Sequence, residues 1–354
     1  MRRFFWLLRS EFKSFLTAPV VHIIAVLQPT LMYLLMSVIM VVPIFEMHIV
    51  KGETALANDF IFAAEEVRSP IGPDYIDPIL VDDASPGHRQ VIEIVTIKGK
   101  PTALQRFGQI DSNLVKNYRN RLTAALLKLW ENDLGSQGVV IQEYPWLPLD
   151  IPYTVFFGMA MIPLAVYLAA AMIGGYLMAR EFEAGTILIY KLSPVPFGWI
   201  LAAKIVRLVI TALAAGAVLY LSLGLITGVW STSFLAVLAI LLPLILIAAC
   251  IGMIAGMLTR SPLPSFLIAL ASAFVFWLVG SGFGLAAGFS RIFEIVSRLI
   301  PNTLIVEMLF PYFYFGREVE ANPTAARLQL AGYVIALLLL LVLVYRKRIL
   351  SKER

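Results

Sequence analysis

Hydrophobic positions of this chain are gathered in long runs rather than in the short periodic stretches of a water-soluble protein. Five such runs contain no Asp, Glu, Lys or Arg: residues 20–45, 151–179, 208–259, 261–290 and 328–345. A helix needs about 20 apolar residues to cross a bilayer, and the third run is long enough for two helices that turn near residues 229–233. We therefore predict an all-α polytopic membrane protein with six transmembrane helices, the third to fifth within residues 205–290.

Composition agrees with a membrane protein. Hydrophobic residues make up 60% of the 354 residues and charged residues 14%, whereas a typical soluble domain is about half apolar and about a quarter charged. Cys250 is the single cysteine, which excludes a disulfide scaffold because it cannot pair within the chain.

The net charge of +5 is unevenly distributed along the chain. Segments on one side of the predicted spans hold four acids and fourteen bases, and these bases are Arg2, Arg3, Arg9, Lys13, Arg180, Lys191, Lys204, Arg207, Arg260, Arg346, Lys347, Arg348, Lys352 and Arg354. Cytoplasmic segments are enriched in Lys and Arg. We therefore expect a multi-pass protein of the cell (inner or plasma) membrane with both termini in the cytoplasm. Residues 346–354 then form a basic cytoplasmic tail, and no nucleic-acid partner is expected.

The first eighteen residues are predicted to form a separate amphipathic helix. Phe4, Phe5, Leu8 and Phe12 recur at helical spacing, and the bases of the segment lie mostly elsewhere around the helix. We expect residues 1–18 to lie along the inner leaflet as an interfacial helix. The alternative is an early start of the first membrane helix, but its bases would be costly at membrane depth.

Residues 46–150 have the composition of a water-soluble domain, with Gly, Pro, Asp and Asn among short apolar runs. Three stretches are predicted to be strands and one a helix: residues 79–81, 91–97 and 139–143, and residues 110–130. We expect an inserted small α/β extracytoplasmic domain. Asp82 and Asp83 could form a cation site, but paired acids at a strand end are typical of a solvated turn, so no metal is expected.

Motifs for enzyme chemistry are missing from the sequence. No phosphate-binding G-x-x-x-x-G-K-[ST] motif occurs, and the three histidines are separated from one another and from Cys250. We therefore expect no enzyme activity and no cofactor in this chain. The uncharged runs also offer no ionisable residue at depth to bind a coupling ion. If the protein moves a substrate against a gradient, its energy is expected to enter from outside the bilayer.

Small residues repeat at the spacing of a close helix contact. Gly-x-x-x-Gly spacing occurs at Gly224 and Gly228, at Gly252 and Gly256, and through Gly280, Gly284 and Gly288. Such spacing fits a helix interface that slides or dimerises. Ordinary packing of membrane helices explains it as well, and we favour packing.

The loop between the second and third spans, residues 180–204, carries a distinctive order of residues. Glu181, Glu183, Gly185 and Thr186 are followed by an apolar stretch, then by Leu192, Ser193, Pro194 and Val195, and then by Ile200, Leu201 and Lys204. This order resembles the first cytoplasmic loop of type-2 permease subunits of ATP-binding-cassette (ABC) exporters. The layout is similar as well, and one subgroup of these permeases has an extracytoplasmic domain after the first span.

The resemblance implies that this loop couples the permease to an ATPase. In the family a short coupling helix docks in a cleft of a separate ATPase subunit, which binds the ATP and Mg²⁺. Gly185 permits a tight backbone reversal, and Thr186 can cap the short helix that follows it. The residues assigned to coupling are Glu181, Glu183, Gly185, Thr186, Lys191, Ser193 and Pro194.

Residues 291–327 are too apolar for a simple exposed loop and are rich in Pro and aromatic residues. In the family this segment forms two half-helices that re-enter the outer leaflet, which here corresponds to residues 299–315. Glu307 would be the deepest charge of this external re-entrant segment, as part of an external gate or as a snorkelling or externally paired carboxylate.

The resemblance implies an exporter that works by alternating access. Two copies of this chain, or this chain and a homologous permease, would pair with two ABC ATPase subunits in the lipid bilayer. One alternative is a mechanotransmitting protein that drives an external partner without substrate passage. Another is an ATPase-independent membrane anchor of a sensor domain.

Overall fold

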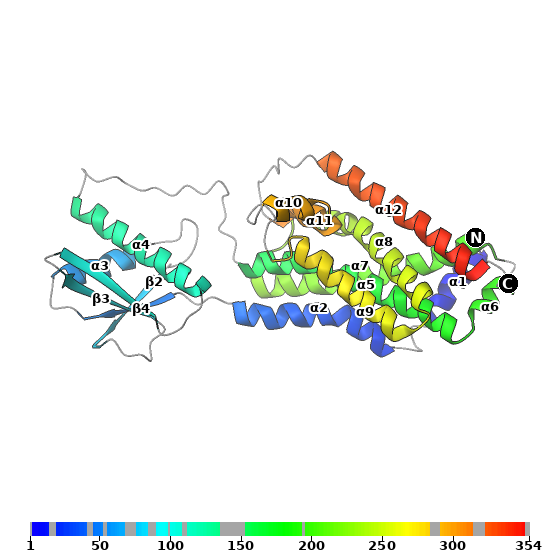
Figure 1. Ribbon diagram of the computed structural model, residues 1–354, viewed down its shortest axis with the longest axis horizontal. Coiled ribbons are helices and arrows are strands. Elements are labelled where there is room, and N and C mark those ends of the chain that lie inside the picture. The colour runs from blue at the N-terminus through cyan, green and yellow to red at the C-terminus, as the bar shows by residue number, and fades with distance from the viewer. Residues whose placement is uncertain are drawn as a thin grey trace. The chain divides into compact units, whose positions relative to one another are not determined.

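The computed structural model divides the chain into two compact units (Figure 1). The helical unit comprises Met1–Met40 and Ile151–Arg354, and the α/β unit comprises Val41–Asp150. The structure describes residues 2–13, 19–40, 45–51, 55–67, 76–83, 90–97, 100–107, 112–134, 153–192, 195–283, 291–313 and 323–350.

Among the described residues, six helices of the helical unit are long and apolar enough to cross a membrane. They are α2 (Pro19–Met40), α5 (Tyr153–Glu183), α7 (Phe197–Thr227), α8 (Phe234–Thr259), α9 (Pro262–Val279) and α12 (Pro323–Tyr345). The prediction of a mostly helical, multi-pass membrane protein with six such helices is confirmed at this level. The turn between α7 and α8 lies near residues 229–233, as predicted. Gly228 ends α7 with φ +71°, and the Ser233 hydroxyl accepts a hydrogen bond from Ala236 N at 3.3 Å at the start of α8.

Helix α5 is the centre of the helical unit. In the apolar 18-residue stretch of α5, 94% of the residues are buried, whereas in that of α12 only 17% are buried. Helix α5 packs against α2, α7, α8 and α9. Small residues explain the close contact with α8, because Gly252 and Gly256 lie directly against the backbone of Ala171 and Gly175. Any side chain at Gly252 or Gly256 would collide with that backbone. This glycine pair therefore serves packing within the chain, as the sequence favoured.

Several helix boundaries differ from the predicted ones. Helix α5 ends at Glu183 and α7 begins at Phe197, both within the predicted loop 180–204. Helix α2 ends at Met40 and a strand begins at Phe45, so the first span is shorter than residues 20–45. Helix α9 ends at Val279, where Asn302 Nδ2 donates to the carbonyl of Gly280 at 2.6 Å. Helix α12 begins at Pro323, earlier than the predicted 328, so that its first turns include Arg327.

The α/β unit contains a four-stranded sheet and two helices. Its elements are β1 (Phe45–Val50), α3 (Ala55–Glu66), β2 (Ile76–Val81), β3 (Gln90–Ile97), β4 (Lys100–Phe107) and α4 (Ser112–Leu134), and the strand order is β2-β1-β3-β4. Strand β1 is parallel to β2 and β3, whereas β3 and β4 form an antiparallel pair. Met47, Ile49, Phe60 and Ile92 pack in its core.

Sequence and structure agree only in part within the α/β unit. The strands predicted at 79–81 and 91–97 lie in β2 and β3, and the predicted helix overlaps α4. The elements β1, α3 and β4 were not predicted. The strand expected at 139–143 lies outside the described residues.

The two ends of the helical unit carry different short elements (Figure 1). One end holds both chain termini with α1 (Arg2–Lys13), α6 (Ile187–Leu192) and the π-helical turn η4 (Arg346–Leu350), which continues α12. The other end holds α10 (Arg291–Arg298) and α11 (Pro301–Phe313). An even number of long helices accounts for the two termini lying at one end.

Candidate functional site

The short helix α6 follows a tight reversal at the end of α5. Helix α5 ends at Glu183, and the chain turns through residues 184–186 into α6. Gly185 has φ +69°, the left-handed conformation that glycine adopts without strain, and its amide donates to the carbonyl of Phe182 at 3.2 Å. A Cβ at this position would meet no atom within 4 Å. The backbone conformation, not lack of space, therefore makes glycine suitable here.

Helix α6 presents apolar side chains on its surface. Ile189 and Leu192 are 64% and 86% exposed, whereas Ile187 is buried. Residues three apart lie on the same side of a helix, so Ile189 and Leu192 form one apolar face. Glu183, just before the reversal, is exposed as well. This end of the helical unit thus exposes the apolar face of α6 and, four residues before that helix begins, the carboxylate of Glu183.

The remaining residues assigned to coupling lie in α6, in the reversal before it, or outside the described residues. Lys191 lies in α6, while Ser193 and Pro194 lie outside the described residues. Thr186 precedes α6, as expected of a cap, and its carbonyl accepts from Ile189 N at 3.0 Å. Its hydroxyl, however, donates back to the carbonyl of Glu181 at 3.3 Å. The hydroxyl of Thr186 thereby stabilises the reversal through a hydrogen bond to the last turn of α5.

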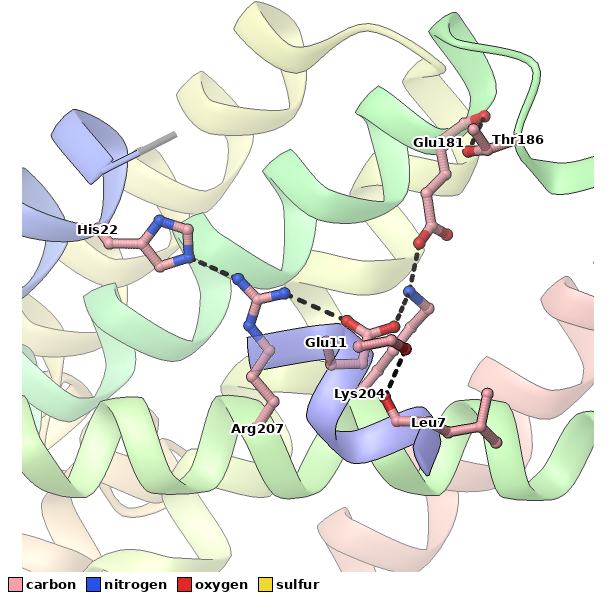
Figure 2. Close-up of polar contacts among 8 residues, drawn as sticks. Leu7, Glu11, His22, Glu181, Thr186, Lys204 and Arg207 are labelled. Carbon is pink, nitrogen blue, oxygen red and sulfur yellow. Dashed lines mark hydrogen bonds and ion pairs between the residues drawn. The ribbon is translucent and has the colours of Figure 1, made fainter. Parts of the chain in front are cut away.

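A buried cluster of charges lies directly behind this reversal (Figure 2). Lys204 Nζ donates to the carboxylate of Glu11 at 2.9 Å and also contacts the carboxylate of Glu181. Arg207 donates through Nη1 to Glu11 at 3.2 Å and contacts Nε2 of His22 through Nη2 at 2.8 Å. The cluster therefore joins α7 to α1, α2 and α5.

The cluster is balanced in charge and almost closed to solvent. The side chains of Lys204 and Arg207 are 2% and 0% exposed, and those of Glu11 and Glu181 are 12% and 16% exposed. An isolated charge in such a place would cost several kcal/mol. Two carboxylates against two cations offset part of that penalty, and charge-assisted hydrogen bonds add to the attraction.

The contact with Arg207 fixes the protonation of His22. A guanidinium offers only N–H donors, so Nε2 of His22 must accept the bond. The imidazole is then neutral, with its proton on Nδ1. Buried next to Arg207, His22 acts as a hydrogen-bond acceptor rather than as a second cation.

The sequence did not predict this cluster. From the sequence, Lys204 was identified as the last residue of the family motif and as one of the fourteen bases. Arg207 was another of these bases, Glu11 was one of the four acids, and His22 was one of the three separated histidines. Glu181 was assigned to the ATPase contact, but in the structure it faces Lys204 inside the helical unit. One local signal was available, because Lys204 and Arg207 are three residues apart in an otherwise apolar stretch and so share a helix face.

At the other end of the helical unit, two short helices occupy the segment expected to re-enter the membrane. Helices α10 and α11 meet at a tight corner, where the hydroxyls of Ser297 and Thr303 are 2.8 Å apart. Glu307 lies in α11 and is half-buried. Burial raises the pKa of Glu307, and the charge of Arg298 opposes that rise.

Neither metal-binding residues nor similarity to known proteins identifies the function of this site. Within the described parts of the chain, no group of three His, Cys, Asp or Glu side chains could hold a metal ion. No protein-family model matches the sequence, and no curated protein is significantly similar to it.

Proposed function

We propose that this chain is the membrane-spanning permease subunit of an ABC exporter, driven by a separate ATPase subunit. The observation that carries the proposal is α6, a six-residue helix with an exposed apolar face of Ile189 and Leu192. Exposed apolar side chains at the end of a membrane protein are typical of a surface that another protein covers. The order of residues that resembles the type-2 permeases lies on and around this helix.

The charge distribution supports an orientation for this proposal. Lys and Arg are concentrated in the segments at the end of the helical unit that holds α1, α6 and η4. With that end in the cytoplasm, as cytoplasmic enrichment in bases favours, α6 faces the compartment that contains ATP. The α/β unit then lies outside the cell, and the α10–α11 pair lies at the outer leaflet of the membrane.

A mechanical path from α6 into the membrane supports coupling. Helix α6 is joined through the Gly185 reversal to α5, and α5 packs against four other helices. Glu181, in the last turns of α5, pairs with Lys204 of α7. A movement imposed on α6 by ATP binding would therefore pass to both α5 and α7. The ATP and Mg²⁺ that power it belong to the partner subunit.

Sparsely buried helices support assembly with a second permease. In the apolar 18-residue stretches of α9 and α12, only 22% and 17% of the residues are buried within this chain. Lipid covers part of such surfaces, and a second copy or a homologous permease covers the rest. Two permeases together would enclose the pathway for export.

Ile189→Glu tests the docking face of α6. We expect this variant to weaken association with the ATPase subunit at least about tenfold, since the change places a charge in a contact built for an apolar side chain. Binding is measured with the purified full-length chain and its ATPase, together with ATP hydrolysis by the reconstituted complex. Phe62→Glu in α3 is the matched control, because Phe62 is also 64% exposed and lies in the α/β unit.

Both variants are expected to unfold at the wild-type temperature, since both side chains are already exposed. Wild-type association and hydrolysis in Ile189→Glu would contradict a docking role for α6. An equal loss in Phe62→Glu would show that any added surface acid disturbs the complex, and this also counts against the proposal.

A further inference from the structure

A groove lies where α1, α2 and α7 meet. Its volume is about 680 Å³, which is within the range of sites that hold small organic ligands. Its lining consists of Arg9, Phe12 and Lys13 of α1, Val26 of α2, and Ile210, Thr211 and Ala214 of α7. The groove adjoins the buried charge cluster but contains none of its side chains.

The walls of this groove are apolar and its α1 side is basic. Arg9 and Lys13 are exposed and one helical turn apart, and none of the residues described as lining the groove is acidic. Thr211 is the other polar residue of the lining, and its hydroxyl donates to the carbonyl of Arg207 at 3.0 Å. The groove therefore combines an apolar surface with two exposed bases of α1 at its edge.

The geometry of α1 explains why its bases line the groove. Successive residues of a helix are rotated by about 100°, so Glu11 points away from both Arg9 and Lys13. Glu11 is engaged by Lys204 and Arg207 on the buried side of α1. The only acid of α1 is thus used inside the helical unit, and its charge does not neutralise the two bases.

The groove lies along the part of α7 that follows the charge cluster. Its α7 residues, Ile210, Thr211 and Ala214, begin three residues after Arg207 and extend about 6 Å along the helix. On α2, Val26 lies seven residues beyond the first residue of the helix, Pro19. The apolar walls thus extend into the membrane from the end that carries the bases.

We propose that this groove binds one anionic phospholipid. Arg9 and Lys13 hold its phosphate and anionic headgroup, and one acyl chain lies along Val26, Ile210 and Ala214. A zwitterionic lipid offers the same chain but no net negative charge to the two bases. A soluble phosphate offers the charge but leaves the apolar walls uncovered. The bound lipid would hold α1 against α2 and α7 beside the ion cluster, whether or not an ATPase is present.

The headgroup part is tested with the double variant Arg9→Gln/Lys13→Gln. Purified full-length protein in detergent is titrated with phosphatidylglycerol or with phosphatidylcholine of the same acyl chains, and bound lipid is counted by native mass spectrometry. We expect the wild type to bind phosphatidylglycerol at least about tenfold more tightly, and the double variant to lose this preference. Lys51→Gln/Arg106→Gln removes two exposed bases of the α/β unit and should keep it.

The acyl-chain part is tested with Ala214→Phe. Ala214 is exposed, so the larger side chain fills the groove without entering the core, and the unfolding temperature should stay unchanged. We expect this variant to lose the tight phosphatidylglycerol site although both bases remain. Wild-type binding in Ala214→Phe would overturn the proposal.

Three further outcomes would overturn the proposal as well. Equal affinity of the wild type for the two lipids would exclude headgroup recognition. Loss of the preference in the α/β-unit control would indicate nonspecific charge attraction. Displacement of phosphatidylglycerol by millimolar inorganic phosphate would identify the site as one for a soluble anion.

Discussion

Ion pairs in the helical unit and in the α/β unit have similar distances but very different surroundings. Lys204 lies 2.9 Å from Glu11, and Lys51 lies 2.7 Å from Asp82. The Lys204 side chain is 2% exposed, whereas the side chains of Lys51 and Asp82 are 59% and 86% exposed. Distance alone would rank the Lys51 pair first. Burial reverses that order, because water competes with an exposed pair and screens it.

The difference separates ion pairs that determine helix positions from those that do not. A buried charge must keep a partner, since its loss leaves the other charge in a medium that solvates it poorly. The cluster around Lys204 and Arg207 therefore holds α1, α2 and α5 at defined places on α7. The exposed pairs of the α/β unit are free to break and re-form in water. Perturbations of the two units should differ accordingly.

Lys204→Met should have the largest effect. The change removes the cation that contacts both Glu11 and Glu181, and breaking a buried pair on one side typically costs about 3–5 kcal/mol. We expect a large fall in the unfolding temperature of the full-length protein in detergent. Lys51→Met is the matched control and should leave that temperature nearly unchanged.

A second variant distinguishes lost pairing from poor packing of methionine. Lys204→Met/Glu181→Gln removes one charge of each sign and leaves the pair of Glu11 and Arg207 in place. This double variant should recover at least about half of the stability lost in Lys204→Met, since neutral groups cost less to bury than ions. No recovery would show that the ion pair is not the source of the difference between the two units.

His22→Leu should have an intermediate effect. It removes the acceptor that faces Arg207 at 2.8 Å, and an unsatisfied buried donor costs about 1–3 kcal/mol. His22→Gln keeps an acceptor near the position of Nε2 and should be closer to wild type. Hydrogen exchange of the α2 and α7 amides, with the unfolding temperature, measures both variants. Equal destabilisation by the two would show that space, not the hydrogen bond, is decisive.

The long helices could be predicted because hydrophobicity is a local property of the sequence. Their ends were harder to place. The apolar run of α2 continues to Phe45, yet β1 begins there with Met47 and Ile49 fully buried. Only Phe45 belongs to both the run and the strand, and a run without charged residues does not mark where a helix within it ends. Strand β4 was missed because it is defined by its antiparallel pairing with β3 rather than by its own residues.

The candidate site also contains one part that neighbouring residues predict and one part that depends on residues far apart in the sequence. The Gly185 reversal and a short helix after it could be predicted from neighbouring residues. The pairing of Glu11 with Lys204 joins residues 193 positions apart, and no local pattern indicates which distant acid meets a buried base. The sequence could only show that Lys204 and Arg207 need partners, because both lie in an apolar stretch.

Asp82→Asn should have the smallest effect, and its pH dependence tests the exposed side of the comparison. Lys51 lowers the pKa of Asp82, first through its hydrogen bond and then through its charge. A lowered carboxyl pKa stabilises the folded state above the pKa of the unfolded chain, about 3.9 for aspartate, and this contribution disappears as pH falls through the folded pKa.

Wild type and Asp82→Asn should therefore differ slightly at pH 7 and become indistinguishable once the pH falls below the lowered pKa of Asp82 in the folded state. Hydrogen exchange of the amides in β1 and β2 is the local measurement, since Lys51 N also donates to the carbonyl of Val81 at 2.9 Å. Because both side chains are exposed, raised salt should remove the small difference at pH 7. A large, salt-insensitive difference would mean that the exposed pair behaves like the buried cluster, and the distinction between the two units would fail.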